Sequence, residues 1–315
     1  MPRRTEVPDF AASTAAHRAE LVVHCYRLLG SVHEAEDLVQ ETMLRAWRAW
    51  DSYDVARASV RTWLYRIATN VCLTALEGRA RRPLPAGLGG PSDDPGAPLT
   101  PSFDVPWLQP FPDARLGDPA ALAAARSGLR LAFVAAMQLL PARQRAVLVL
   151  RDVLEFSAAE VATMLGATTA SVNSALQRAR AGVAGASADG LAEVDGTVID
   201  RYVRAFEAAD VEALVSLLTD DVVLEMPPVP HWYRGATDYG RFMTRLFSMR
   251  GPHWRLMPSA ANGQPTLAAY CRHDDVYRLH TLQLFTVRAG RVAHIVVFQD
   301  PALPELFGLP PVLAP

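Results

Sequence analysis

The chain has 315 residues, half of them apolar, which is enough for two or three domains with buried cores. Its 31 cationic residues are all arginine and oppose 33 acidic residues, and the net charge of −2 argues by itself against a simple nucleic-acid binder. No run of about 18 apolar residues could span a bilayer, no apolar stretch behind the charged N-terminus marks a signal peptide, and the three isolated cysteines favour neither a zinc site nor disulfides. We therefore expect a reduced, cytoplasmic protein without a membrane segment, a metal or another cofactor.

The charges are distributed unevenly along the chain. Residues 57–82 carry six arginines and one acidic residue, and residues 119–183 carry seven arginines and three acidic residues. Residues 83–118 hold one arginine and five aspartates, and eleven arginines face fifteen acidic residues after residue 184. Two basic modules separated by an acidic linker and followed by an acidic domain favour DNA as a partner.

Residues 11–82 are predicted to be helical throughout. A first apolar stripe ends at Gly30. The following segment, residues 33–50, is expected to expose the acidic residues of its first turns and to bury four large apolar side chains: Leu38, Met43, Leu44 and Trp47. A third helix starts at residue 60 and is expected to end in a basic strip just before Pro83.

Residues 83–118 contain nine prolines and five glycines, so they cannot form a compact element of their own. Residues 105–112, VPWLQPFP, are nevertheless rich in apolar side chains. A disordered spacer seldom carries Trp, Leu and Phe together, and we expect this patch to dock onto a folded surface. The alternative is a coincidental apolar cluster in a linker.

Residues 156–183 show the pattern of two helices joined by a tight turn. Ser157 and Glu160 form a capping box, Gly166 ends the first helix, and Thr168 or Thr169 can cap the second. The second helix turns an apolar face inward and polar groups outward, which is what a DNA recognition helix requires. A plain helical hairpin is the alternative. A proline-started helix precedes this pair, and the Gly-rich residues 184–195 follow it as a second hinge.

The periodicity changes after residue 196. Residues 198–218 are predicted to be helical with a break at Ala209-Asp210, and short alternating runs follow at 222–226, 267–271, 282–287 and 292–298. Residues 288–291 are expected to join the last two runs as a hairpin. Helices followed by a curved antiparallel sheet define an α+β domain.

The motifs of residues 11–183 resemble those of the extracytoplasmic-function (ECF) sigma factors, the promoter-specificity subunits of bacterial RNA polymerase. The resemblance rests on AEDLVQET at 35–42, TWLYRIATN at 62–70 and the segment 140–180. It implies two all-α sigma domains, region 2 at 11–83 and a helix-turn-helix region 4 at 119–186, joined by a linker at 84–118. Core RNA polymerase and promoter DNA are the implied partners.

The resemblance also implies roles for individual residues. The residues expected to bind core polymerase are Glu34, Asp37, Leu38, Gln40 and Glu41. Those expected to contact the −10 element are Arg61, Arg66, Asn70, Thr74, Arg79, Arg81 and Arg82. Those expected to contact the −35 element are Arg143, Thr169, Ser171, Asn173, Ser174, Gln177, Arg178 and Arg180. Many family members have a basic-polar-basic run at positions 173–175, where this chain has Asn-Ser-Ala, so its arginines should carry more of the phosphate contact.

Residues 196–315 resemble a SnoaL-like domain of the ketosteroid-isomerase cone fold. The isomerase tyrosine aligns with Tyr202, but Met226 stands at the position of the base, and Leu282-Gln283 at that of the second acid. Because proton abstraction needs a base within reach, a non-catalytic domain is expected. A small molecule could still occupy a pocket lined by Tyr202, Met226, Trp232 and Trp254. The predicted function is a sigma factor modulated in cis by this domain; the alternative is a ligand-gated DNA-binding regulator or a fused isomerase or hydrolase.

Overall fold

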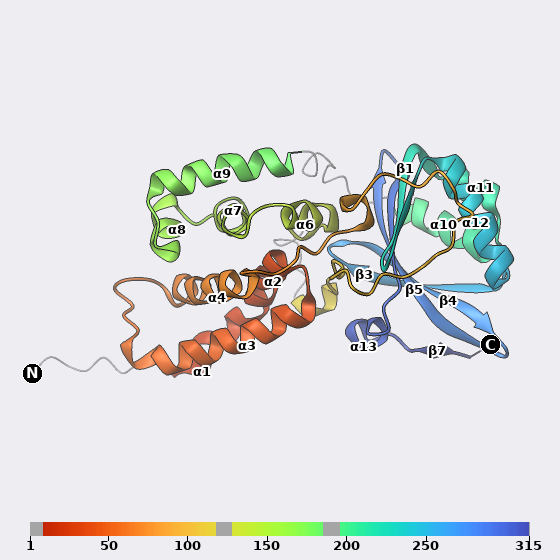
Figure 1. Ribbon diagram of the computed structural model, residues 1–315. Helices are drawn as coiled ribbons and strands as arrows, with labels where there is room; N and C mark the ends of the chain where they lie inside the picture. Colours follow the sequence, from red (N-terminus) through yellow and green to blue (C-terminus); the bar gives the residue numbers. More distant parts are fainter. Residues whose placement is uncertain (1–8, 118–127, 185–195, 315) are drawn as a thin grey trace, which may run out of the picture. The chain divides into compact units, whose positions relative to one another are not determined.

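The computed structural model describes residues 9–117, 128–184 and 196–314. The chain divides into two compact units, the first formed by residues 1–81 and 115–187 and the second by residues 82–114 and 188–315 (Figure 1). The predicted second hinge at 184–195 lies, apart from its first residue, outside the described residues. None of the helices described in these ranges is long and apolar enough to cross a membrane.

The described part of the first unit is helical. Its elements are α1 (Phe10–Thr14), η1 (Ala15–His17), α2 (Arg18–Leu29), α3 (Val32–Ala49), η2 (Trp50–Ser52), α4 (Val60–Leu76), α6 (Leu131–Gln138), α7 (Ala142–Leu148), η5 (Val149–Val153), α8 (Ala158–Leu165) and α9 (Thr169–Val183). The short helix η4 (Asp113–Leu116) crosses the boundary between the two units. Every residue of α2 from Leu21 to Leu29 is buried, because this helix packs against α3 and α4 and also against α6 and α7. The core of the first unit therefore joins the two sigma-like modules.

Local capping signals set the helix boundaries in this unit. Gly30 adopts a left-handed conformation that ends α2, and the Ser31 hydroxyl caps α3. The Ser59 hydroxyl accepts a hydrogen bond from the Thr62 amide at the start of α4. The expectation that this helix continues to Pro83 is wrong: α4 ends at Leu76, before the left-handed Gly78, and the basic strip follows outside any regular element.

The inward face predicted for α3 is also partly wrong. Its buried residues are mostly small: Val32, Ala35, Val39, Thr42 and Ala46. The large side chains Leu44 and Trp47 are 41% and 62% exposed. Small residues allow α3 to approach α2 and α4 closely, and the large apolar groups are left on the outer face.

The second unit is an α+β domain, as predicted. It contains α10 (Gly196–Glu207), α11 (Val211–Ser216), β1 (Leu218–Met226), β2 (Val229–Arg234), α12 (Ala236–Arg250), β3 (Trp254–Ala261), β4 (Gln264–His273), β5 (Val276–Arg288), β6 (Arg291–Phe298), α13 (Leu303–Phe307) and β7 (Val312–Leu313). The strand order is β2-β1-β6-β5-β4-β3, with β1 and β6 parallel, and β7 pairs with β5. Ala209 and Asp210 break the first helix as expected, and Ala289-Gly290 form the hairpin turn. Five elements of this unit were not predicted from the sequence: β2, β3, α12, α13 and β7.

The segment between the two modules, residues 82–114, packs on the second unit, and we call it the strap. Its apolar residues Leu108 and Phe111 are buried, so the patch at 105–112 docks on a folded surface as expected. The strap includes η3 (Pro85–Gly87), which lies beside β1 and β2. Phe111 and Asn262 exchange hydrogen bonds: the Phe111 amide donates to Asn262 Oδ1 at 2.8 Å, and the Asn262 amide donates to the Phe111 carbonyl at 2.9 Å.

Candidate polymerase and DNA interfaces

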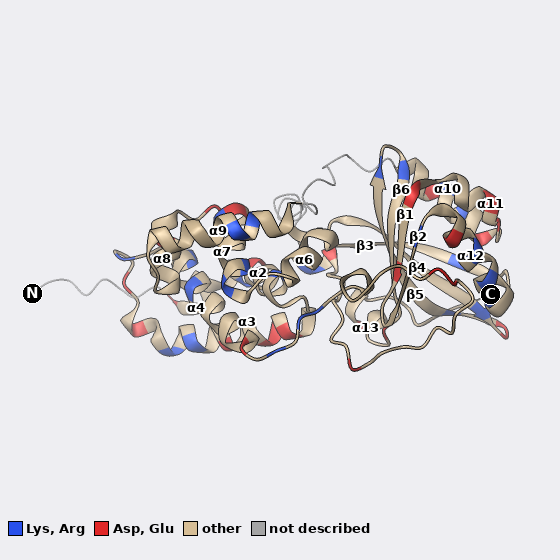
Figure 2. Cartoon of the chain, turned by 45° about the horizontal axis from the view of Figure 1, so that its top comes forward, with Lys and Arg blue, Asp and Glu red and all other residues tan. Residues whose placement is uncertain are grey.

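The outer face of α3 carries the residues predicted to bind polymerase. Asp37 and Gln40 are exposed, and Glu34, Leu38 and Glu41 are half-buried. Leu44 and Trp47 continue the same face, because residues three or four apart are neighbours on a helix. The acidic side chains lie along the first half of α3 and the basic ones near its end (Figure 2). The face is thus an acidic surface with an apolar end.

Two of these acidic residues are already paired. Glu34 lies 3.1 Å from Arg79, and Glu41 lies 2.6 Å from Arg45, one helical turn further on. Among the described residues Asp37 has no ion-pair partner. Asp37 is therefore the carboxylate of this face that is free to meet a basic partner.

An exposed polar stripe runs along α4. Arg66, Asn70 and Thr74 follow one another at intervals of four residues and are all exposed. Asn70 and Thr74, which are expected to contact the −10 element, both lie within α4. The Asn70 amide nitrogen donates to the Arg66 carbonyl at 2.8 Å and to the Met164 carbonyl in α8 at 3.2 Å.

The other arginines predicted at the −10 element are dispersed. Arg61 is bound to Glu20 at 3.1 Å and lies over the ring of Tyr65. Arg79 pairs with Glu34, and Arg81 is exposed. Arg82 belongs to the strap, where its guanidinium donates to the Trp107 carbonyl at 3.2 Å. The predicted basic strip is therefore shared between the two units.

The predicted helix-turn-helix is present in detail. Ser157 and Glu160 form both hydrogen bonds of the capping box, and Gly166 takes the left-handed conformation. Of the two candidate caps for α9, it is Thr168 whose hydroxyl accepts the Ser171 amide hydrogen. The inward residues Val172, Leu176, Ala179 and Val183 are buried. The outward residues are exposed: Thr169, Ser171, Asn173, Ser174, Gln177, Arg178 and Arg180.

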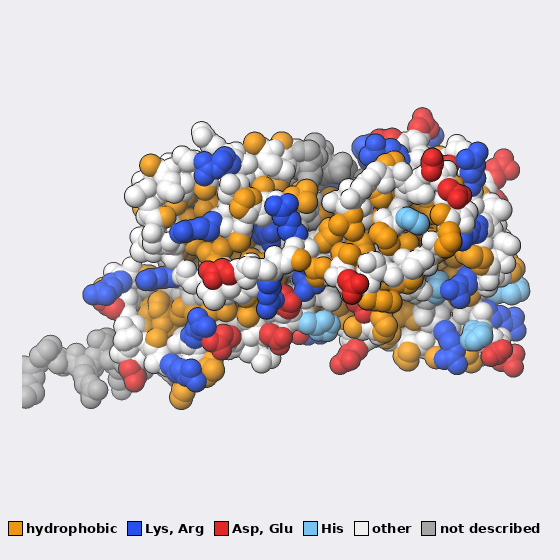
Figure 3. Space-filling view, in the orientation of Figure 1, with side chains coloured by type: hydrophobic (Ala, Val, Ile, Leu, Met, Phe, Trp, Pro, Cys, Tyr) orange, Lys and Arg blue, Asp and Glu red, His pale blue; other side chains and the backbone are white. Residues whose placement is uncertain are grey.

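The arginines of this module differ in their surroundings. Arg180 makes two hydrogen bonds to Asp152, at 2.8 and 2.7 Å, and this carboxylate raises the pKa of the guanidinium. Arg143 donates to the Leu165 carbonyl at 2.8 Å. Within the described residues Arg178 forms no ion pair. Arginine side chains are visible on both modules of the first unit (Figure 3).

Neutral groups form the polar network inside the cone of the second unit. The Tyr202 hydroxyl lies 2.9 Å from the Tyr239 hydroxyl and donates to Gln283 Oε1 at 3.3 Å. Burial raises the pKa of both tyrosines, so both are protonated at neutral pH. Tyr202, Met226 and Trp254 share one buried cluster. Trp232 instead donates its indole N–H to the Gly89 carbonyl of the strap at 2.9 Å.

Glu225 is a buried charged residue that was not among the predicted site residues. Its neighbour Met226 faces the cone interior, so Glu225 points to the opposite face of β1, as alternation along a strand requires. There it is 2% exposed, lies 2.8 Å from Nε2 of His294 and accepts the Ala86 amide hydrogen of the strap at 2.7 Å. The sequence signal that could have identified Glu225 is an acidic residue placed between the apolar residues Leu224 and Met226.

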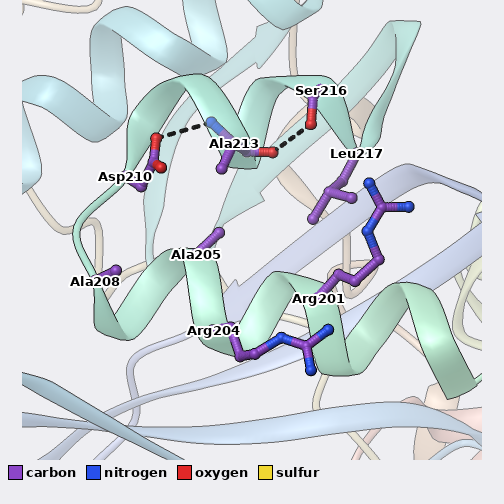
Figure 4. Close-up of a pocket in the computed structure, with 8 residues that line it drawn as sticks. All are labelled: Arg201, Arg204, Ala205, Ala208, Asp210, Ala213, Ser216 and Leu217. Carbon is purple, nitrogen blue, oxygen red and sulfur yellow. Dashed lines mark hydrogen bonds between the residues drawn. The ribbon is translucent and has the colours of Figure 1, made fainter.

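Two surface cavities lie in the second unit. One of about 320 Å³ is formed between α10 and α11, and Figure 4 shows Arg201 reaching toward Leu217 while Arg204 points away from α11. Two of its lining residues form hydrogen bonds with Ala213 of α11: the Asp210 carboxylate accepts from the Ala213 amide, and the Ser216 hydroxyl donates to the Ala213 carbonyl. The other, of about 270 Å³, lies between strap residues such as Trp107 and the loop at Pro227-Pro228. None of the four residues predicted to line a ligand pocket borders either cavity.

Comparisons with known proteins follow the same division. Profiles of Sigma-70 region 2, Sigma-70 region 4 and the SnoaL-like domain match residues 14–82, 130–181 and 199–295. The ECF RNA polymerase sigma factor SigG of Mycobacterium tuberculosis is 48% identical over 312 residues, covering 96% of this chain and 84% of SigG. This chain belongs to the ECF family of RNA polymerase sigma factors. The predicted family and the SnoaL-like extension are thus confirmed.

Other relatives of this ECF sigma factor share the whole arrangement. SigJ of the same organism is 31% identical over 311 residues, covering 94% of this chain and 92% of SigJ. The crystal structure of SigJ superposes with a TM-score of 0.67 at 28% sequence identity and covers 95% of this chain and all of that one. The similarity therefore includes the C-terminal domain as well as the two sigma regions.

Proposed function

We propose that the outer face of α3 binds core polymerase, that the stripe on α4 reads the −10 element, and that the outer face of α9 reads the −35 element. The second unit modulates this activity in cis. The observation that carries the proposal of modulation in cis is the docking of the strap on the cone domain, because the strap is the chain segment that links region 2 to region 4. The protein would act in the cytoplasm, where its partner polymerase works.

The exposed apolar residues support the assignment of α3. Exposed clusters of large apolar side chains mark interaction surfaces, and aromatic residues are enriched where partners bind. Leu44 and Trp47 lie beside Asp37 and Gln40 on one helical face. Asp37 would steer a basic partner surface toward the helix, and Trp47 would supply most of the buried contact.

Variants of α3 test this assignment. The double variant Asp37→Arg and Glu41→Arg should reduce capture of core polymerase at least tenfold, because like charges then oppose each other across the interface. The matched control is Glu212→Arg, at an exposed acidic position on α11. The free energy of unfolding of the parent chain, the double variant and the control should agree within about 0.5 kcal/mol. Unchanged capture by the double variant would exclude α3 as the polymerase contact.

The strap supports modulation in cis because it is closed into a loop. The Leu108 amide donates to the Pro83 carbonyl at 3.1 Å, so 24 residues between them add nothing to the reach of the linker. Extended, the same residues could span about 80 Å at roughly 3.3 Å per residue. In a sigma factor, regions 2 and 4 must lie apart on polymerase to contact the −10 and −35 elements together. A docked strap would therefore favour a compact, inactive state.

The interior of the cone supports a regulatory rather than a catalytic domain. Tyr202, Tyr239 and Gln283 form a neutral hydrogen-bonded network, and Met226 is packed in the apolar cluster beside it. Proton abstraction needs a base in contact with the substrate. The buried carboxylate of Glu225 faces the strap on the other side of β1 and would not reach a molecule inside the cone.

A further inference from the structure

The polar stripe on α4 is engaged by region 4 within the first unit. Asn70, in the middle of this stripe, donates to the carbonyl of Met164 in α8, the first helix of the helix-turn-helix. The other hydrogen bond from the same amide nitrogen goes to Arg66. A carboxamide nitrogen has two hydrogens, so both donors of Asn70 are used. Asn70 cannot donate to a base while the contact with Met164 persists.

Aromatic packing supports this polar contact. Phe156, in the turn before α8, lies edge-on against the ring of Tyr65 with centroids 5.5 Å apart. The guanidinium carbon of Arg61 lies 5.1 Å from the centre of the Phe156 ring and 4.8 Å from that of Tyr65. Phe156 and Tyr65 are both buried. One phenylalanine of region 4 therefore holds two residues of the helix that is proposed to read DNA.

A second set of contacts joins region 4 to α2. Arg145 of α7 is buried and donates to Gln138, to the Leu140 carbonyl and to the Leu28 carbonyl in the last turn of α2. Burial lowers its pKa to about 10, which leaves the guanidinium charged at neutral pH. Arg27 of α2 donates to the Gly128 carbonyl at 2.9 Å. The contact thus involves α2 as well as α4.

We infer that the face of α4 around Asn70 is a docking surface for the chain's own helix-turn-helix, and that region 4 and single-stranded DNA compete for it. The inference rests on the proposed role of α4 in reading the −10 element. Unlike the action of the strap, this competition uses contacts of the first unit alone. Release of region 4 would free the Asn70 donor that binds the Met164 carbonyl and remove the Phe156 ring from Arg61 in one step.

Energy transfer in the full chain tests the docking. Donor and acceptor dyes are placed on Asp51→Cys and Ala181→Cys, both at exposed positions, with Cys271→Ser; the remaining cysteines, Cys25 and Cys72, are buried. Phe156→Ala removes the ring contacts with Tyr65 and Arg61. The matched control is Leu176→Ala, a buried residue of α9, which packs on α6, α7 and α8.

We expect high transfer in the parent chain, a fall in transfer on saturation with a mixed-sequence single strand of about 12 nucleotides, and low transfer in Phe156→Ala without DNA. Phe156→Ala should bind the strand roughly tenfold more tightly, equivalent to about 1.4 kcal/mol. Leu176→Ala should behave as the parent. If Phe156→Ala fails to fold, Phe156→Leu keeps the apolar volume without the ring and should give an intermediate result.

Two results would overturn the inference. If a folded Phe156 variant shows the same energy transfer as the parent chain, Phe156 does not hold region 4 on α4, and the docking inference fails. A loss of transfer with no gain in DNA binding would exclude competition with DNA. The two proposals have separate readouts: energy transfer and strand affinity test the contact of region 4 with α4, whereas polymerase capture and transcript yield test α3 and the strap. Loss of the α3 or strap effects would therefore count against the proposed function and not against this contact.

Discussion

Arg178 and Arg180 are two residues apart on α9 and have different electrostatic surroundings. Arg180 is held by two hydrogen bonds to Asp152, whereas Arg178 is exposed without an ion pair among the described residues. A DNA phosphate would have to displace the Asp152 carboxylate before it could bind Arg180. Arg178 needs no such exchange. Exposed ion pairs are weak, so breaking this pair costs little free energy, but the cost reduces the contribution of Arg180 to DNA binding.

We expect Arg178→Ala to weaken −35 binding about equally for all sequences and to lower the slope of log K against log salt by roughly 0.9, as for one lost phosphate contact. Arg180→Ala should have the same character with a smaller effect. Ser171→Ala and Asn173→Ala should alter the preferred sequence and leave the slope unchanged. Selection from randomised duplexes and titration at several salt concentrations measure both quantities; the reverse pattern would refute these roles.

At the scale of elements, the helix-turn-helix owes its boundaries to local hydrogen bonds. Ser157 and Glu160 satisfy amides at the start of α8, and Thr168 does so at the start of α9. The Ser157 hydroxyl and amide also lower the pKa of Glu160, so the carboxylate stabilises the helix start when it is ionised. Such caps matter because α8 has only two turns.

Ser157→Ala should lower the free energy of unfolding by about 1 kcal/mol, the usual cost of losing an N-cap side chain. Thr163→Ala in the same helix is the control, because its exposed hydroxyl bonds only the preceding turn and its loss should cost less than about 0.5 kcal/mol. Denaturant titration followed by circular dichroism compares them. Equal losses in the two variants would show that the capping box does not determine the stability of α8.

The elements that sequence predicted best are those with local determinants. The capping box, Gly166 and the apolar stripe of α9 act within a few residues, and each has its expected place. The prediction of the inward face of α3 was wrong because two large apolar residues, Leu44 and Trp47, lie on a surface that faces solvent in the free chain. Size and hydrophobicity do not distinguish a core from a partner surface.

Long-range contacts could not be predicted. The strap is held by hydrogen bonds from backbone amides, such as that of Phe111 to Asn262 Oδ1 and that of Ser92 to the Trp232 carbonyl. Backbone donors leave no mark in a sequence. Asn70 was identified as polar and exposed, but its bond to Met164 spans 94 residues of chain. The residues of these sites could be proposed from sequence, whereas their pairings required the structure.

At the scale of the whole molecule, one chain segment links the two sigma modules in sequence but belongs to the unit that contains the cone domain. The strap joins region 2 to region 4 in sequence and packs with the second unit in space. Under the proposed modulation in cis, release of the strap would let region 2 and region 4 move further apart. A bias of only about 1.4 kcal/mol toward the docked strap would reduce the population of the extended chain tenfold.

Run-off transcription with core polymerase, from a promoter recovered from a randomised library, tests this account most directly. The full chain should initiate at a defined site, and Phe111→Ala, which removes a buried anchor of the strap, should raise the transcript yield several-fold. Phe103→Ala, in the same strap but at a side chain that is 79% exposed, should leave the yield unchanged. Equal yields from all three proteins would contradict modulation through the strap, and the absence of a promoter-specific transcript from the full chain would contradict the central claim.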